Sequence, residues 1–209
     1  MTDQEVLTMI QYALVESPDG GASFPSGLWT RDEVIHAFNT RQRQLLRDTH
    51  LIVTRIEIAV GIAENPTALP VDWVATLFCD WRTAGGVRSP LTPCDAFEVD
   101  LIVPTWETVA GVPIVFLDGD EGTLTIRLAP IPAAAGTLEL LYIALPTAAN
   151  GNGVTLSIPD EFLDGVRYGT LADLLGKVGR GADPARAAYC QERFELTEAI
   201  VSILLEGWS

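Results

Sequence analysis

The C-terminal third of the chain constrains the fold most, because its apolar residues recur with the spacing of two consecutive helices. The first helix is predicted to begin within Ser157–Glu161, where a proline stands at the start and two carboxylates face the positive end of the helix dipole. Gly179–Gly181 interrupts the pattern, and Asp183–Pro184 supplies the cap and first position of a second helix. The chain is therefore expected to end in two helices joined by a short turn.

The last of these helices carries apolar residues on two sides. One stripe consists of Tyr189, Leu196, Ile200 and Ile203, and the other of Cys190, Phe194, Val201 and Leu205. An apolar side chain on a helix needs a neighbour that covers it, so two stripes predict a central helix with neighbours on both sides. Because little sequence follows this helix, we expect the N-terminal helices to cover it.

The preceding helix carries a stripe of small residues. Gly165, Gly169, Ala172 and Gly176 recur at i, i+4, i+7 and i+11. A glycine inside a helix costs about 0.5–1 kcal/mol relative to alanine, so a closely packed neighbour is expected to compensate for three of them. That neighbour is either another helix of the same chain or a second subunit, and the second possibility makes these four residues candidates for a subunit interface.

Two further helices are predicted at the N-terminus. Thr2–Val15 has one apolar side, and Thr30–Glu33 is a capping box that opens a helix to about residue 48. Arg41, Arg43 and Arg47 lie largely off the apolar face of this second helix. They are either solvated side chains paired with acidic neighbours or a basic docking face for an acidic partner.

The middle of the chain favours strands. Residues 55–60 alternate between polar and apolar side chains, which predicts a strand with one wet face. Leu69–Trp73 is predicted to begin a short helical connection that leads to Phe78 and Trp81, and Thr92–Asp95 to begin another helix. Three strands are expected afterwards, with a hairpin turn at residues 118–122 between the first two: Pro113–Leu117, Leu124–Leu128 and Leu138–Leu145.

These elements predict an α+β fold in which the N- and C-terminal helices form an α-helical bundle with a small β-rich domain inserted. We expect the N-terminal helices of the bundle at residues 1–50, the inserted β-rich region at 51–153, and the C-terminal helices that complete the bundle at 154–209.

The charge of the chain restricts its partners. The 209 residues carry a formal net charge of −15, and Lys177 is the one lysine among 13 basic residues. Such an acidic protein is not expected to grip nucleic acid through its phosphates, although it can surround nucleic acid without holding it. No apolar run approaches the roughly 20 residues of a membrane span, and the N-terminus lacks the basic region of a secretory signal. We therefore expect no membrane partner.

No motif predicts chemistry. His36 and His50 have no second ligand at metal-binding spacing, and Cys79, Cys94 and Cys190 are far apart, as expected of buried thiols in a reducing compartment. The turn at residues 118–122 resembles the start of a calcium loop but lacks the carboxylate at position 12. We predict no catalytic residue, cofactor or metal site, and no enzyme.

The C-terminus ends on an aromatic side chain. Apolar residues continue to Leu205, Gly207 can stop the helix, and Trp208 follows. Trp208 is expected either to fold back onto its own bundle or to anchor in a pocket of a partner, since tryptophan is a frequent interface hot spot. Leu205 and Trp208 are therefore candidates for contact with a partner.

The order of these segments resembles the head-to-tail adaptor proteins of tailed bacteriophages, also called head-completion or neck connector proteins. The resemblance runs from Trp29 almost to the end of the chain and is most specific in the two C-terminal helices. The similar segments are Trp29–Ile35 with Asn39 and Gln42–Asp48, Leu69–Trp73, Pro104–Trp106, Leu128–Pro132 with Gly136–Leu138 and Tyr142, Ile158–Phe162, Tyr168–Gly169, Asp183–Tyr189 and Arg193–Phe194.

This resemblance implies a structural virion protein rather than an enzyme. It implies a homo-oligomeric ring, commonly of twelve copies, that binds the portal protein, meets a downstream tail or nozzle protein, and leaves a channel through which genomic DNA passes without specific binding. The implied location is the neck of the virion, after synthesis in the host cytoplasm. Two other functions stay open: a different neck or tail component such as a stopper or tail terminator, and a metal-binding accessory domain of a hydrolase.

Overall fold

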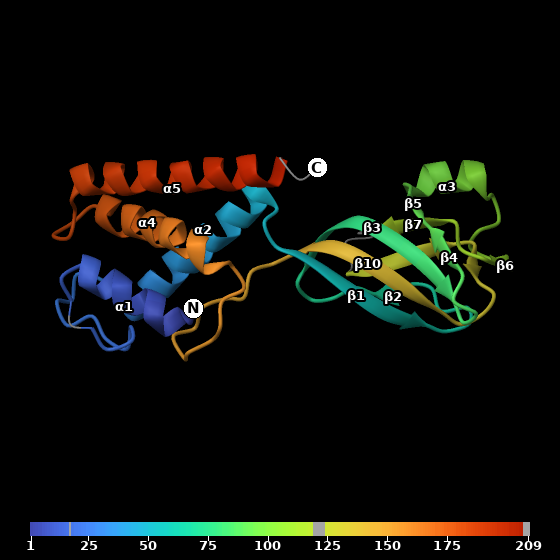
Figure 1. Cartoon of the computed structure of the whole chain (residues 1–209), viewed down its shortest axis with the longest axis horizontal. Coiled ribbons are helices and arrows are strands. Elements are labelled where there is room, and N and C mark those ends of the chain that lie inside the picture. The colour runs from blue at the N-terminus through green and yellow to red at the C-terminus, as the bar shows by residue number, and fades with distance from the viewer. Residues whose placement is uncertain (17, 119–123, 207–209) are drawn as a thin grey trace. The chain divides into compact units, whose positions relative to one another are not determined.

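The computed structural model describes residues 1–16, 18–118 and 124–206 (Figure 1). The chain divides into two compact units, residues 1–52 with 145–209 and residues 53–144. The first unit holds four long helices and is called the helical unit, whereas the second holds the sheets and is called the β unit. Helices and sheets occur together, which confirms the mixed α+β class.

The helical unit contains α1 (Asp3–Ala13), α2 (Arg31–Thr49), α4 (Asp160–Gly176) and α5 (Pro184–Glu206). Capping boxes start the first two helices: Thr2 caps α1 together with Glu5, and Thr30 caps α2 together with Glu33. Each box satisfies backbone N–H groups that have no partner inside the helix. The predicted start of α2 is therefore confirmed.

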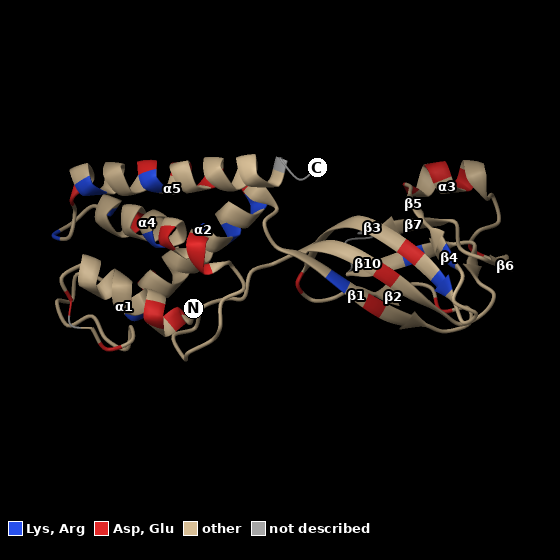
Figure 2. Ribbon diagram, viewed as in Figure 1, with Lys and Arg blue, Asp and Glu red and all other residues tan. Residues whose placement is uncertain are grey.

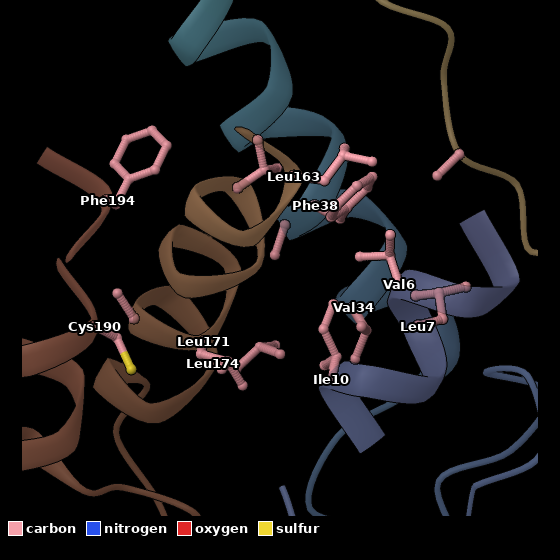
Figure 3. Close-up of a cluster of buried hydrophobic side chains, with 14 of the residues drawn as sticks. Val6, Leu7, Ile10, Val34, Phe38, Leu163, Leu171, Leu174, Cys190 and Phe194 are labelled. Atoms are coloured by element: carbon pink, nitrogen blue, oxygen red, sulfur yellow. The ribbon is translucent and has the colours of Figure 1, made fainter. Parts of the chain in front are cut away.

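The central helix of this unit is α4, and the prediction that α5 is central was wrong. Helices α1, α2 and α5 all contact α4, and Figure 3 shows α4 between side chains from α1 and α5. On α5 only one of the two apolar stripes is buried, through Cys190, Phe194 and Val201. The N-terminal helices pack mainly on α4, so they leave the second stripe of α5 uncovered.

The small-residue stripe of α4 is the surface on which α5 packs. A Cβ atom added to Gly165 would overlap the side chain of Thr197, and one added to Gly169 would lie 2.8 Å from Cδ2 of Phe194 and 3.0 Å from Cδ of Arg41. Without side chains at these positions, the two helices approach closely enough for Phe194 to be fully buried. The neighbour that compensates for these glycines thus comes from the same chain.

Residues 145–153 pack with the helical unit, although their sequence position follows the last strand. The buried carboxylate of Asp3 accepts hydrogen bonds from the backbone N–H groups of Asn150, Gly151 and Gly153 at 2.7–2.9 Å. Burial by itself raises the pKa of Asp3, but these three donors outweigh burial and lower it. The first residues of α1 therefore hold the loop that leads into α4.

The β unit is built from two four-stranded sheets. The first has the order β1 (Val53–Val60), β10 (Gly136–Ala144), β3 (Trp73–Thr83) and β4 (Arg88–Pro90), and all its neighbours are antiparallel. The second has the order β2 (Thr67–Ala68), β8 (Thr125–Ala129), β7 (Val115–Asp118) and β5 (Thr92–Pro93). A short parallel pair, β6 (Ala110–Gly111) and β9 (Ile131–Pro132), and the helix α3 (Ala96–Ile102) complete the unit.

Four of the strands and the start of α3 agree with the sequence pattern. The bounds of β1, β7, β8 and β10 lie within two residues of the predicted segments, and Asp95 caps α3 in a capping box with Glu98. Most of the predicted turn at residues 118–122 lies outside the described residues.

The segment from Trp73 to Thr83 forms strand β3, so the predicted helical connection was wrong. Cys79 and Trp81 of β3 are buried in the core. Phe78, also on β3, is exposed and pairs with Leu141 of β10. Two register irregularities place Val74 and Leu77 outside the regular pairing with β10. These extra residues interrupt the alternation of polar and apolar side chains that marks a strand in the sequence, so the pattern looks helical. Pairing with the distant strand β10 nevertheless makes the segment a strand.

Charged residues tie together the face of the first sheet that lies opposite the core. Glu139 of β10 is buried among three arginines: its Oε2 lies 2.6 Å from Arg55, and its Oε1 lies 2.9 Å from Arg82 and 2.8 Å from Arg88. In Figure 2 the acidic positions of β1, β10 and β3 lie side by side across the sheet, with basic positions near them. The hydrogen bond from Arg55 and the nearby arginine charges lower the pKa of Glu139 below its ordinary value. Glu139 thus links all four strands of this sheet electrostatically.

Replacing Gly169 by leucine is expected to destabilise the isolated chain. The new side chain must displace Phe194 or Arg41, and overpacking of this kind typically costs about 1–3 kcal/mol. Thermal unfolding of the monomer measures the loss. Gly176→Ala is the matched control on the same helix, because its Cβ would lie 3.9 Å from that of Ala187, an ordinary contact. An unchanged melting temperature for Gly169→Leu would contradict the packing described here.

Replacing Glu139 by glutamine is expected to lower the melting temperature most at neutral pH. The pKa of Glu139 is lower in the folded chain than in the unfolded one, so the ionised carboxylate contributes stability above its unfolded pKa. That contribution disappears as the pH falls through the folded pKa. The difference in melting temperature between the wild type and Glu139→Gln should therefore shrink in acid. Glu57→Gln is the control, because Glu57 is exposed and contacts one arginine, Arg82. A difference that does not change with pH would refute this role.

Candidate functional site

The second stripe of α5 is an exposed apolar row on the helical unit. Tyr189, Leu196, Ile200 and Ile203 are 44–68% exposed. Their spacing places them on one side of the 23-residue helix, and we call them the α5 stripe. Apolar residues exposed in a continuous row commonly mark a surface that binds a partner.

Charged residues accompany the N-terminal half of the α5 stripe. Arg193 donates a hydrogen bond from Nε to the hydroxyl of Tyr189 at 3.0 Å, and its guanidinium carbon lies over the ring, 5.2 Å from the centroid. The same hydroxyl raises the pKa of Arg193. Glu192 and Glu195 are exposed beside it, and these residues line a shallow depression with Tyr189 and Leu196. Glu195 accepts a hydrogen bond from Gln191 at 2.9 Å. The stripe therefore offers apolar contact area together with two exposed carboxylates.

The predicted basic face of α2 divides into two parts. Arg41 points inward: its guanidinium binds both carboxylate oxygens of Asp173, at 2.5 and 2.8 Å, and lies 5.0 Å from the ring centroid of Phe194. Its side chain is only 12% exposed, so Arg41 supports the packing of α2, α4 and α5. Arg43 and Arg47 are exposed, and only these two remain available for docking.

Arg43 and Arg47 border a shallow groove on the helical unit. Thr40, Gln44 and Leu145 complete its lining. Arg47 lies 3.1 Å from its neighbour Asp48, and this ion pair is exposed to solvent. Exposed ion pairs contribute little to the free energy of folding. Gln44 donates to Glu198 of α5 at 3.1 Å. Burial and the charge of Asp48 raise the pKa of Glu198. The groove thus presents two arginines and one exposed leucine to solvent.

The other predicted interface residues have different surroundings. Gly165, Gly169 and Ala172 are buried, and the space over the two glycines is filled by α5, so a second subunit has no access to them. Gly176 is exposed at the end of α4. Leu205 is 36% exposed at the C-terminal end of α5. Trp208 lies outside the described residues.

Neither a metal-ligand cluster nor a membrane-spanning helix occurs in the part of the chain that the structure describes. No three His, Cys, Asp or Glu side chains there are grouped so that they could hold a metal ion. None of the described helices has the length and apolar character needed to cross a bilayer. Burial raises the pKa of the Cys79 thiol to about 12, which opposes formation of the reactive thiolate.

The sequence identified both stripes of α5 but did not indicate which one stays exposed. No local signal distinguishes them, because both consist of large apolar residues at helical spacing. The choice depends on how α5 rotates when Phe194 enters the space above Gly169.

Comparison with known proteins identifies the family. A sequence model of the SU10 adaptor protein family matches residues 2–206, which is almost the whole chain. No curated protein matches the sequence. The resemblance to phage head-to-tail adaptors was based on the helix starts and the Pro-rich segments of the sequence. The family match confirms it. The chain belongs to the SU10 adaptor protein family.

Proposed function

We propose that this protein is the head-to-tail adaptor of a tailed bacteriophage. In this proposal about twelve copies form a ring that binds the portal protein, meets a downstream tail or nozzle protein, and encloses a channel for the genome. The protein acts as a structural part of the virion neck, without catalysis, after synthesis in the host cytoplasm. The observation that carries the proposal is the exposed α5 stripe in a member of an adaptor family.

The α5 stripe supports assembly because its side chains stay 44–68% exposed, although Tyr189 contacts the ring of Tyr168 edge-on. A soluble protein rarely keeps such a row of large apolar side chains in water unless a partner buries it. A second copy, a portal subunit or a tail protein can each supply that cover. An adaptor needs several such contacts at once, since it binds its own copies and a protein on either side.

The acidic composition supports the proposed channel. With a net charge of −15 per copy, a ring of this protein surrounds DNA with negative charge. Like charges repel the phosphates, so a moving duplex is not trapped by nonspecific binding. This property suits a passage for DNA better than a site that holds it.

Assembly with the portal tests the proposal directly. We expect the purified chain to be a monomer or small oligomer that forms a ring when it is mixed with the portal protein of the same phage. Analytical ultracentrifugation measures the association, and electron microscopy of the complex counts the copies. A chain that stays monomeric and never binds the portal would refute the proposal, and binding to tail proteins alone would favour a stopper or tail terminator.

Replacing Ile200 by serine is expected to separate assembly from folding. Ile200 is exposed, so the free energy of unfolding of the monomer should change by no more than about 0.5 kcal/mol, whereas ring formation should be weakened. Val201→Ser is the matched control, because the adjacent side chain is fully buried and its loss should cost about 1–3 kcal/mol. Normal ring formation by Ile200→Ser would show that the stripe is not part of an assembly contact.

A further inference from the structure

We propose that the α5 stripe of one copy docks on the groove of α2 in the next copy, with Glu192 and Glu195 facing Arg43 and Arg47. The inference rests on the proposed ring and names the two surfaces that close it. The occupant of the stripe is thus a second copy of this chain, bound head to tail.

A ring requires two different surfaces on each copy. When a surface binds the same surface of a second copy, the pair is complete and no third copy is added. When it binds another part of the neighbour, each addition leaves a new site, and the series closes into a ring if the rotation permits. The α5 stripe therefore needs a complementary surface elsewhere on the same chain.

The basic side chains show where that surface lies. Of the 13 basic residues, all but two contact an acceptor or an aromatic ring within the described chain. The two exceptions among the described residues are Arg43 and Arg180. In a chain with 28 acidic residues, an arginine without a partner is unusual. Arg43 lies in the groove of α2, whereas Arg180 lies in the turn between α4 and α5.

The chemistry of the two surfaces is complementary. The groove combines Arg43 and Arg47 with Leu145, which is exposed. The stripe combines exposed apolar side chains with Glu192 and Glu195. Two of these four charges have a partner on their own helix: Arg47 contacts exposed Asp48, and Glu195 accepts from uncharged Gln191. Of the other charges nearby, Arg193 binds Tyr189 and Glu198 accepts from Gln44. Apolar contact then supplies affinity, and the opposite charges set the orientation of the neighbour.

Charge reversal on each surface tests the contact. We expect Glu192→Arg with Glu195→Arg to raise the concentration needed for ring formation on the portal about tenfold or more, because like charges then meet across the interface. Arg43→Glu with Arg47→Glu should have the same effect. A variant that carries all four changes should recover assembly, because its two altered surfaces are again complementary.

The controls separate this contact from folding and from portal binding. All four residues are exposed, so thermal unfolding should show that each variant stays folded. Arg180→Glu reverses the other arginine that lacks a partner and should leave assembly unchanged. Recovery by the fourfold variant is expected only if the two surfaces touch each other, since a portal contact would stay disrupted.

Each outcome decides between the two proposals. If the unmodified chain forms rings and both reversal variants form them equally well, the docking proposal is overturned while the adaptor function stands. If the reversals prevent assembly but the fourfold variant does not recover, the two surfaces do not meet and the docking proposal is also overturned. Failure of the unmodified chain to assemble on the portal overturns the adaptor function itself.

Discussion

The close contact between α4 and α5 determines the organisation of the helical unit. Gly165 and Gly169 leave room for Thr197 and Phe194, and this approach rotates α5 so that Cys190, Phe194 and Val201 are buried. The same rotation turns the other apolar stripe outward. The glycines of α4 therefore influence more than packing, because the space above them determines which face of α5 is exposed to a partner.

The arginines, like the apolar stripes of α5, divide into those that bind within the chain and those that remain open to a partner. Most arginines are engaged within their own unit: Arg41 joins α2 to α4, and three arginines surround Glu139 in the first sheet. Neutralisation at these sites stabilises strands and helices of a strongly acidic chain. Arg43 lacks such a partner and lies next to exposed Arg47, so this part of α2 remains able to bind an acidic surface.

The sequence predicted much of the secondary structure, because the relevant signals are local. Capping boxes at Thr30 and Asp95 specify helix starts through contacts three residues away. Strand β3 was missed because Val74 and Leu77 interrupt its alternation, and pairing with the distant β10 compensates for the interruption. For Arg41 the sequence left two alternatives open, pairing with an acidic neighbour or a docking face, because its partner Asp173 is far away in the sequence.

The sequence by itself determined the mixed class, the helix starts, the small-residue stripe and the family to which the chain belongs. Hydrogen bonds within a few residues and a fixed order of segments are sufficient for these properties. Tertiary structure alone decided that α4 is central and that the α5 stripe is exposed. Two equally apolar faces have the same local preference for burial, so only the shape of the neighbouring helix, with its space above Gly165 and Gly169, can select between them.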